Sequence, residues 1–224
     1  MHRTKNTWRI DGDTLVLLNR ADGVEIYCPA ASAPYVLQHT CCIRYTNGKV
    51  HRVQTTIPDP RGGRRADGRA KQTTLSLHAL ILENAPENAR QLDQTQIDHE
   101  DGNPLNNRLD NLRWVTPSAN QQNRRDAQGN PNRGIQRDSR GCLTQPWRAQ
   151  IEVDGKKVAS KYFYTAREAE EQYLKLKRQY HPETPEVWYE QYAACQASGY
   201  WDAPAPTNSS APAPATLFES MESR

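Results

Sequence analysis

The sequence has few of the residues that build a disulfide framework, a zinc site or a membrane span. Its five cysteines are Cys28, Cys41, Cys42, Cys142 and Cys195, and they form no C-x-x-C pair and no Cys/His set with zinc spacing. Their odd number and scattered spacing predict reduced thiols in a cytoplasmic protein. No apolar run approaches the length that crosses a bilayer, and the polar start predicts no signal peptide.

Apolar residues are also scarce, at 36% of 224 residues, which predicts one to three domains without a single large core. The net charge is only +3, but the basic residues are clustered. Residues 61–71 carry five Lys/Arg against one acidic residue, and residues 133–178 carry eleven against six. Segregated basic stretches are typical of proteins that bind nucleic acid, so a nucleic acid is the expected partner.

The most informative stretch runs from residue 97 to residue 125. It opens with the pair Asp98-His99 and turns through residues 101–104, where Gly and Asn allow a tight reversal. Residues 109–115 are rich enough in apolar side chains to form a strand. The stretch therefore predicts a strand, a loop and a second strand.

A helix should follow, because Thr116 can cap it and Pro117 suits its first position. We expect this helix to continue through Arg125, with Asn120 in its first turn.

The residue types in this stretch suit metal-assisted hydrolysis. The carboxylate of Asp98 and the carboxamide oxygen of Asn120 are hard ligands, which favour Mg²⁺ over zinc, and Mn²⁺ also suits oxygen ligands. If Asp98 lies in a strand, His99 points to the opposite face. A neutral imidazole there can take a proton from an attacking water molecule.

These residues, together with Asn111, resemble the HNH nucleases in the Asp-His…Asn…Asn form of phage and intron-encoded homing endonucleases. Asn111 lies twelve positions after His99, and Asn120 lies nine after Asn111. The resemblance implies a metal-dependent DNA endonuclease that nicks one strand as a monomer. It implies that His99 is the general base, that Asp98 and Asn120 bind the metal, and that Asn111 ties the loop. The alternative is a DNA-binding regulator that has lost cleavage.

The region before the motif reads as short strands between residues 8 and 57, with Asn47-Gly48 as a hairpin turn. The loop at residues 58–71 is either a flexible connection or an arm that contacts phosphate through Arg64 and Arg65. His78 lies in an apolar run, where a packing role is favoured over a place near the metal.

A second unit follows, with strands at residues 134–137, 147–153 and 158–163 and a helix at residues 166–180. Asp154-Gly155 should form a hairpin turn, and Thr165 should cap the helix. The buried stripe of the helix is expected to consist of Ala169, Tyr173, Leu176 and Tyr180.

The order of three strands and one helix resembles the AP2 DNA-binding domain, through Arg133-Gly134-Ile135 and the segments at residues 147–151, 155–157 and 162–169. That family places its sheet in the major groove. The residues expected to contact DNA are Arg133, Arg137, Arg140, Trp147, Arg148, Gln150, Lys156, Lys157 and Lys161. The alternative is a basic module that binds something else.

The sequence as a whole predicts an α+β protein in several parts, with no obligatory protein partner. The expected parts are a β-rich N-terminal region with a basic loop (1–72), a ββα-metal HNH nuclease unit (73–127), a linker (128–132), an AP2-like domain (133–182), a C-terminal helix (183–201) and a disordered tail (202–224).

Overall fold

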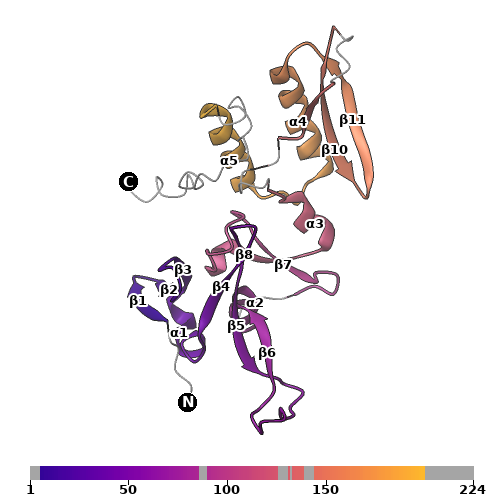
Figure 1. Ribbon diagram of the computed structural model, residues 1–224. Coiled ribbons are helices and arrows are strands. Elements are labelled where there is room, and N and C mark those ends of the chain that lie inside the picture. Colours follow the sequence, from indigo (N-terminus) through magenta and orange to yellow (C-terminus); the bar gives the residue numbers. More distant parts are fainter. Residues whose placement is uncertain (1–5, 86–89, 126–130, 132, 139–143, 200–224) are drawn as a thin grey trace.

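The computed structural model describes residues 6–85, 90–125, 131, 133–138 and 144–199 (Figure 1). It mixes helices and small antiparallel sheets, which agrees with the predicted α+β class. The predicted tail, Cys142 and most of the predicted linker lie outside the described residues. Among those that are described, no helix is both long and apolar enough to cross a membrane.

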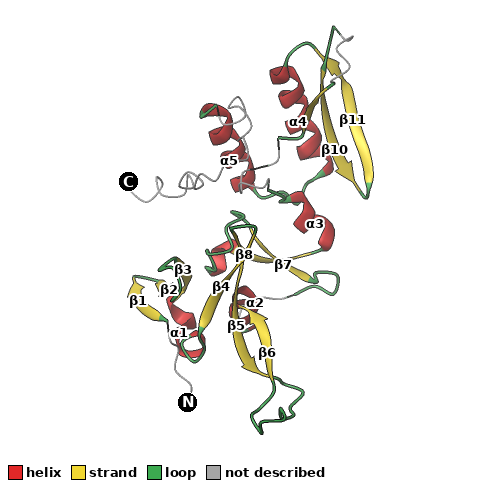
Figure 2. Ribbon diagram, in the orientation of Figure 1, coloured by secondary structure: helices red, strands yellow, loops and turns green. Residues whose placement is uncertain are grey.

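Two three-stranded sheets form the N-terminal part (Figure 2). The first contains β1 (Thr7–Asp11), β2 (Thr14–Leu18) and β3 (Glu25–Pro29), and the second contains β4 (Cys41–Thr46), β5 (Lys49–Pro58) and β6 (Gln72–Ser76). A 3-10 turn (η1, Ala30–Ser32) and a short helix α1 (Ala33–Val36) that the sequence did not predict connect them. The predicted hairpin turn is confirmed, because Asn47 and Gly48 both have positive φ, at 52° and 75°.

Residues 77–122 continue with α2 (Leu77–Glu83), β7 (Gln96–His99), a 3-10 turn η2 (Leu109–Asn111), β8 (Leu112–Val115) and α3 (Pro117–Gln122). β7 and β8 pair antiparallel, which confirms the predicted order of strand, loop, strand and helix. Leu109 belongs to the turn and not to the strand, and it is exposed.

The expected continuation of α3 to Arg125 is wrong. Asn123 leaves helical geometry at the C-cap, where its side chain turns toward Asp98 of β7.

One hydrophobic core joins the N-terminal sheets to this region. Leu17 and Ile26 of the first sheet share a cluster with Val53 of the second, Ile81 of α2 and Leu112 of β8. The cluster therefore spans both sides of the boundary expected at residue 72. Burying these side chains together fixes α2 and β8 against the N-terminal sheets.

The C-terminal unit is a sheet in the order β11-β10-β9 with two helices. Its elements are β9 (Ile135–Arg137), β10 (Trp147–Val153), β11 (Lys156–Phe163), α4 (Ala166–Tyr180) and α5 (Glu186–Ala197). The turn at Asp154 and Gly155 has positive φ at both residues, as predicted. Thr165 caps α4 in a reciprocal pair with Glu168.

Three of the four expected residues of the α4 stripe are buried, and the inclusion of Tyr180 is wrong because its side chain is exposed. The last turn of α4 packs instead through Lys177, whose ammonium contacts Gln122 and the ring of Trp188. Trp188 and Tyr192 of α5 are almost fully buried in the same cluster as Tyr173. The C-terminal helix is thus part of the core of this unit.

Candidate active site

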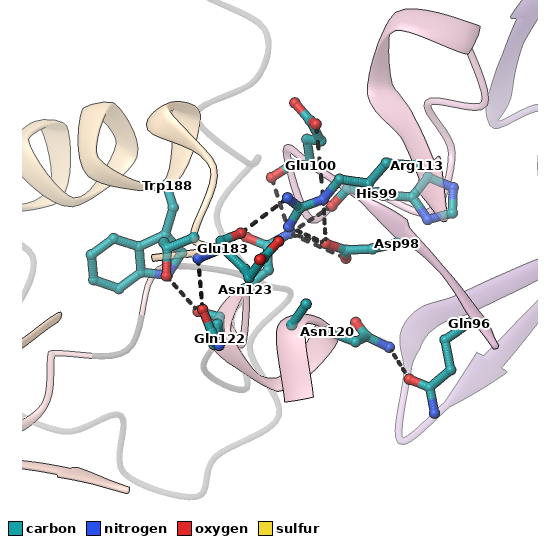
Figure 3. Close-up of polar contacts among 12 residues, drawn as sticks. Gln96, Asp98, His99, Glu100, Arg113, Asn120, Gln122, Asn123, Glu183 and Trp188 are labelled. Atoms are coloured by element: carbon teal, nitrogen blue, oxygen red, sulfur yellow. Dashed lines mark hydrogen bonds and ion pairs between the residues drawn. The ribbon is translucent and has the colours of Figure 1, made fainter. Parts of the chain in front are cut away.

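Asp98 lies at the centre of a polar network on β7 (Figure 3). Its side chain is only 9% exposed. Arg113, directly opposite on β8, donates to Asp98 Oδ2 from Nη2 (2.9 Å) and Nε (3.2 Å). Asn123 Nδ2 lies 3.1 Å from Oδ1 and 3.0 Å from Oδ2 of the same carboxylate. The carboxylate is thereby held from both sides in one orientation.

The helix α3 runs along β7 and places two amides over it. Asn120 and Asn123 are three residues apart and share a helix face, whereas Gln96 and Asp98 share a strand face. Asn120 Nδ2 donates to Gln96 Oε1 at 2.7 Å, while Asn123 reaches Asp98 (Figure 3). Asn120 is therefore the neighbour of Gln96, and no hydrogen bond joins it to Asp98 among the described residues.

The oxygen atoms left on Asp98 and Asn120 fit a divalent cation. Among the described residues, Asp98 Oδ1 accepts a hydrogen bond only from the Asn123 amide, and Asn120 Oδ1 accepts none. One carboxylate and one carboxamide oxygen suit Mg²⁺, which needs only one or two protein ligands. No group of three or more His, Cys, Asp or Glu residues gathers as a metal site within the described ranges.

His99 lies on the other face of β7, as the strand alternation predicts. Its Nε2 is 3.3 Å from Oδ1 of Asn107, a fully buried residue, and its ring touches the ring of His78. Burial lowers the pKa of His99 below the usual value, while the contact with Asn107 and the charges of Asp101 and Asp98 oppose that shift. The imidazole is neutral near pH 7 and can accept a proton.

The ring of His78 packs edge to face against the ring of His99, the candidate base. His78 itself is half-buried. Burial lowers the pKa of His78 to about 4, and the positive charges that His99 and Arg52 can carry act in the same direction.

The loop between β7 and β8 is closed by Asn111. Its Nδ2 donates to Asp101 Oδ1 (2.9 Å) and to the carbonyl of Asn106 (2.8 Å), and its Oδ1 accepts from the Asp101 amide (3.0 Å). The backbone of Tyr27 in β3 pairs with Leu105 and Asn107 of the loop. The loop is thus fixed from within and from the N-terminal sheet.

Sequence reasoning missed three residues of this network: Arg113, Asn107 and Asn123. The sequence could have indicated Arg113, because it is a charged residue inside a short apolar strand. Asn123 lies three residues after Asn120, which is a weaker indication. Nothing distinguishes Asn107 from the other asparagines of its loop.

Only some of the residues expected to contact DNA lie on the face of the C-terminal sheet that points away from α4. α4 packs on the face that carries Ala149 and Ile151. Arg148 and Gln150 alternate with these core residues and lie on the other face, as does Lys157, which pairs with Glu152. On this face Arg148 and Gln150 are partly exposed and Lys157 is exposed.

The other expected DNA contacts lie elsewhere. Arg133 turns toward α4, where its Nε pairs with Glu170 at 2.7 Å, so its guanidinium has a structural role. Arg137 lies opposite Trp147 and 5.9 Å from its ring. Lys156 is exposed beside the hairpin turn, Lys161 lies at a register shift of β11, and Arg140 is outside the described residues.

The loop that carries Arg64 and Arg65 joins β5 to β6 and is exposed throughout residues 60–71. It lies at the opposite end of the molecule from β10 and β11 (Figure 1). Arg64 donates within the loop to the carbonyl of Gly68, and the Arg65 side chain is exposed.

Residues 86–122 match the sequence profile of the HNH endonuclease family. The matched segment contains Asp98, His99, Asn111 and Asn120, and Asn123 lies just beyond it. This similarity suggests a nuclease that acts on DNA, in a family that generally uses a divalent metal ion.

A particular relative is protein 3.8 of Escherichia phage T7, which is 40% identical over 60 residues. The alignment covers 27% of this chain and 49% of that protein, so the chain spans about half the length of this relative. No solved structure matches.

Proposed function

We propose that this protein is a metal-dependent DNA endonuclease of the HNH homing type that hydrolyses a phosphodiester bond in duplex DNA. The observation that carries the proposal is the pair Asp98 and His99 on β7. One residue presents a fixed carboxylate to one face of the strand, and the other presents a neutral imidazole to the opposite face. The match at residues 86–122 supports the same reading.

Each of these residues would have a separate role in hydrolysis. Asp98 and Asn120 would hold a divalent ion, Mg²⁺ or Mn²⁺, through their carboxylate and carboxamide oxygens. The bound ion supplies charge stabilisation at the scissile phosphate and the leaving oxygen. His99 takes the proton from the attacking water, Asn107 orients its ring, and Asn111 holds the loop that carries Asn107.

The sheet of the C-terminal unit would bind the duplex in the AP2 manner. Arg148 and Gln150 on its open face can read bases, while Lys157 and the exposed Lys156 and Lys161 meet phosphates. The loop with Arg64 and Arg65 would contact phosphate at the other end of the molecule, so the duplex would pass the nuclease site between them. With one site per chain, the monomer nicks one strand.

A supercoiled plasmid assay tests this proposal. Wild-type protein with Mg²⁺ or Mn²⁺ should convert the plasmid to nicked circles, and EDTA should stop the reaction. His99→Ala should lose at least about 100-fold in rate and keep DNA binding, because only proton transfer is removed. Normal cutting by His99→Ala would overturn the assignment of the base. Salt-sensitive duplex binding without cleavage under any metal condition would instead indicate a DNA-binding regulator.

We also propose that the protein works in the cytoplasm. Among the described residues, Cys28, Cys41 and Cys42 are free thiols, which suits a reducing compartment.

A further inference from the structure

The connection between α4 and α5, together with the adjoining turns of both helices, contacts the candidate active site although it lies far from it in the sequence. We define the docking segment as residues 177–191. The carbonyl of Glu183 accepts a hydrogen bond from Arg113 Nη1 at 3.0 Å, and the Glu183 amide donates to Gln122 Oε1 at 2.9 Å (Figure 3). The two partners of Glu183 therefore lie on β8 and on the last turn of α3.

Further contacts extend this docking along the segment. Lys177 Nζ and Thr184 Oγ1 both donate to the carbonyl of Gln122, and Trp188 Nε1 donates to the carbonyl of Arg124 at 3.3 Å. These contacts occupy the C-terminal end of α3, the helix that carries Asn120 and leads into Asn123.

The docking segment also reaches the loop between β7 and β8. Gln191 Nε2 donates to the carbonyl of Asp101 at 3.1 Å. The side chain of Asp101 is in turn held by Asn111, which closes the loop. The segment therefore contacts two supports of the site, namely the ion pair of Asp98 and the loop beside His99.

Arg113 transmits the position of the segment to Asp98. Its planar guanidinium directs Nε and Nη2 to Asp98 Oδ2 while Nη1 points to the Glu183 carbonyl. Since the group is rigid, fixing one of its edges fixes the direction of the other. Oδ2 is thereby occupied, and Oδ1 is the carboxylate oxygen left for an ion.

We propose that the docking segment is a positioning element of the nuclease site, which orients the Asp98 carboxylate through Glu183 and Arg113. This inference rests on the proposed function, because it gives Asp98 the role of a metal ligand. Arg113 is here a positioning residue and not a catalytic one. The nuclease site then depends on residues that lie beyond the DNA-binding sheet in the sequence.

Titration of the full chain with Mn²⁺, followed by the electron paramagnetic resonance signal of the free ion, tests the proposal without relying on cleavage. Arg113→Lys keeps the positive charge near Asp98 but loses the planar guanidinium that contacts Asp98 and Glu183 together. Gln122→Met leaves Asp98 and Arg113 intact but removes the acceptor for the Glu183 amide. Arg167→Lys is the matched control, because Arg167 forms an exposed ion pair with Glu171 on α4, outside the docking segment.

We expect Arg113→Lys to weaken Mn²⁺ binding by about tenfold or more, as loss of an outer partner of a ligand usually does. Gln122→Met should shift the Mn²⁺ affinity in the same direction by a smaller factor, and Arg167→Lys should match wild type. The metal concentration for half-maximal cleavage should rise in parallel, with the rate at saturating metal largely kept. A change only in thermal stability would indicate a purely structural role and overturn the proposal.

The outcomes separate this inference from the proposed function. Unchanged Mn²⁺ affinity in both variants, with intact circular dichroism spectra, overturns the inference alone. If Arg113→Lys does not fold, Gln122→Met decides. Wild-type protein that binds Mn²⁺ but cuts no DNA overturns the proposed function, while the titration still decides the inference. Wild-type protein that binds no Mn²⁺ overturns both.

Discussion

His78 and His99 meet edge to face, with ring centroids 5.2 Å apart and planes inclined by 78°. The first residue lies on α2 and the second on β7, so the contact depends on how the helix packs under the strand. Burial lowers the pKa of both imidazoles, and both rings are therefore neutral near pH 7. A T-shaped contact between neutral rings limits the rotation of His99.

His78→Phe should retain this contact, whereas His78→Ala should remove it and leave His99 free to turn. We expect single-turnover cleavage to stay close to wild type in the first variant and to fall by up to about 100-fold in the second, since small misplacements of a catalytic group are costly. DNA affinity measured in parallel should be the same in both. Equal cleavage by His78→Ala and wild type would show that His78 only fills space.

Asn111→Ala should destabilise the protein by about 2 kcal/mol, because it removes both donors and the acceptor that close the loop and leaves buried partners unpaired. Urea denaturation measures this loss. Asn111→Asp should destabilise the protein at least as much as Asn111→Ala at neutral pH, because it places a second carboxylate against Asp101. Recovery of Asn111→Asp at low pH would support that cause, and wild-type stability in both variants would contradict the role of the loop tie.

Gly134→Ala should destabilise the C-terminal unit by about 3 kcal/mol, from positive φ and overpacking together. The added Cβ would lie 1.9 Å from the Tyr173 ring, at a φ of +62°. Gly155→Ala is the matched control, because its φ is +74° but its Cβ would meet open space, and it should cost only about 1 kcal/mol. Thermal unfolding of both variants compares the two costs, and equal values would exclude the Tyr173 clash.

The buried Lys177 should make stability rise with pH. Burial, followed by the charge of Arg125, lowers its pKa to about 7. The lysine of the unfolded chain titrates near pH 10.4, so between about pH 7 and 10 the unfolded state binds more protons and raising the pH favours folding, by at most about 1.4 kcal/mol per pH unit.

Lys177→Met should remove this contribution. The free energy of unfolding, measured against pH for both proteins, should therefore rise for wild type relative to Lys177→Met between about pH 7 and 10. Parallel curves would mean that Lys177 titrates normally.

Two arginines of the C-terminal unit should respond differently to replacement by alanine. Arg148→Ala should weaken duplex binding by about 1–3 kcal/mol and relax the preference at one base pair, because Arg148 lies on the face of the sheet proposed to read bases. Arg133→Ala should chiefly lower stability, because it leaves the buried Glu170 without its ion pair. Fluorescence anisotropy with the target duplex and with base-substituted duplexes distinguishes the two variants, and wild-type affinity and base preference in Arg148→Ala would contradict the DNA-facing assignment.

Features that depend on neighbours in the chain were predictable from the sequence. The turns at Asn47-Gly48 and Asp154-Gly155 and the caps at Thr116 and Thr165 follow from backbone preferences and short-range hydrogen bonds. The opposite orientation of Asp98 and His99 follows from the alternation of a strand.

Features that depend on contacts between distant residues were not predictable. Asn123 ends α3 and contacts Asp98, which lies 25 residues earlier, and its sequence neighbours give no sign of this. The pairing of Asn120 with Gln96 depends on how α3 lies along β7. Tyr180 fits the helical period but lies at the end where Lys177 takes the buried position.

The contacts of α5 limit which segments of this protein could be exchanged for those of another protein. Trp188 fills the core of the C-terminal unit, and its indole nitrogen also donates to the carbonyl of Arg124, just beyond α3. A hybrid made by exchanging everything after the predicted linker would thus replace one side of this contact as well as the sheet proposed to bind DNA. To exchange the C-terminal unit alone, the incoming module would have to reproduce the contacts of Glu183, Trp188 and Gln191.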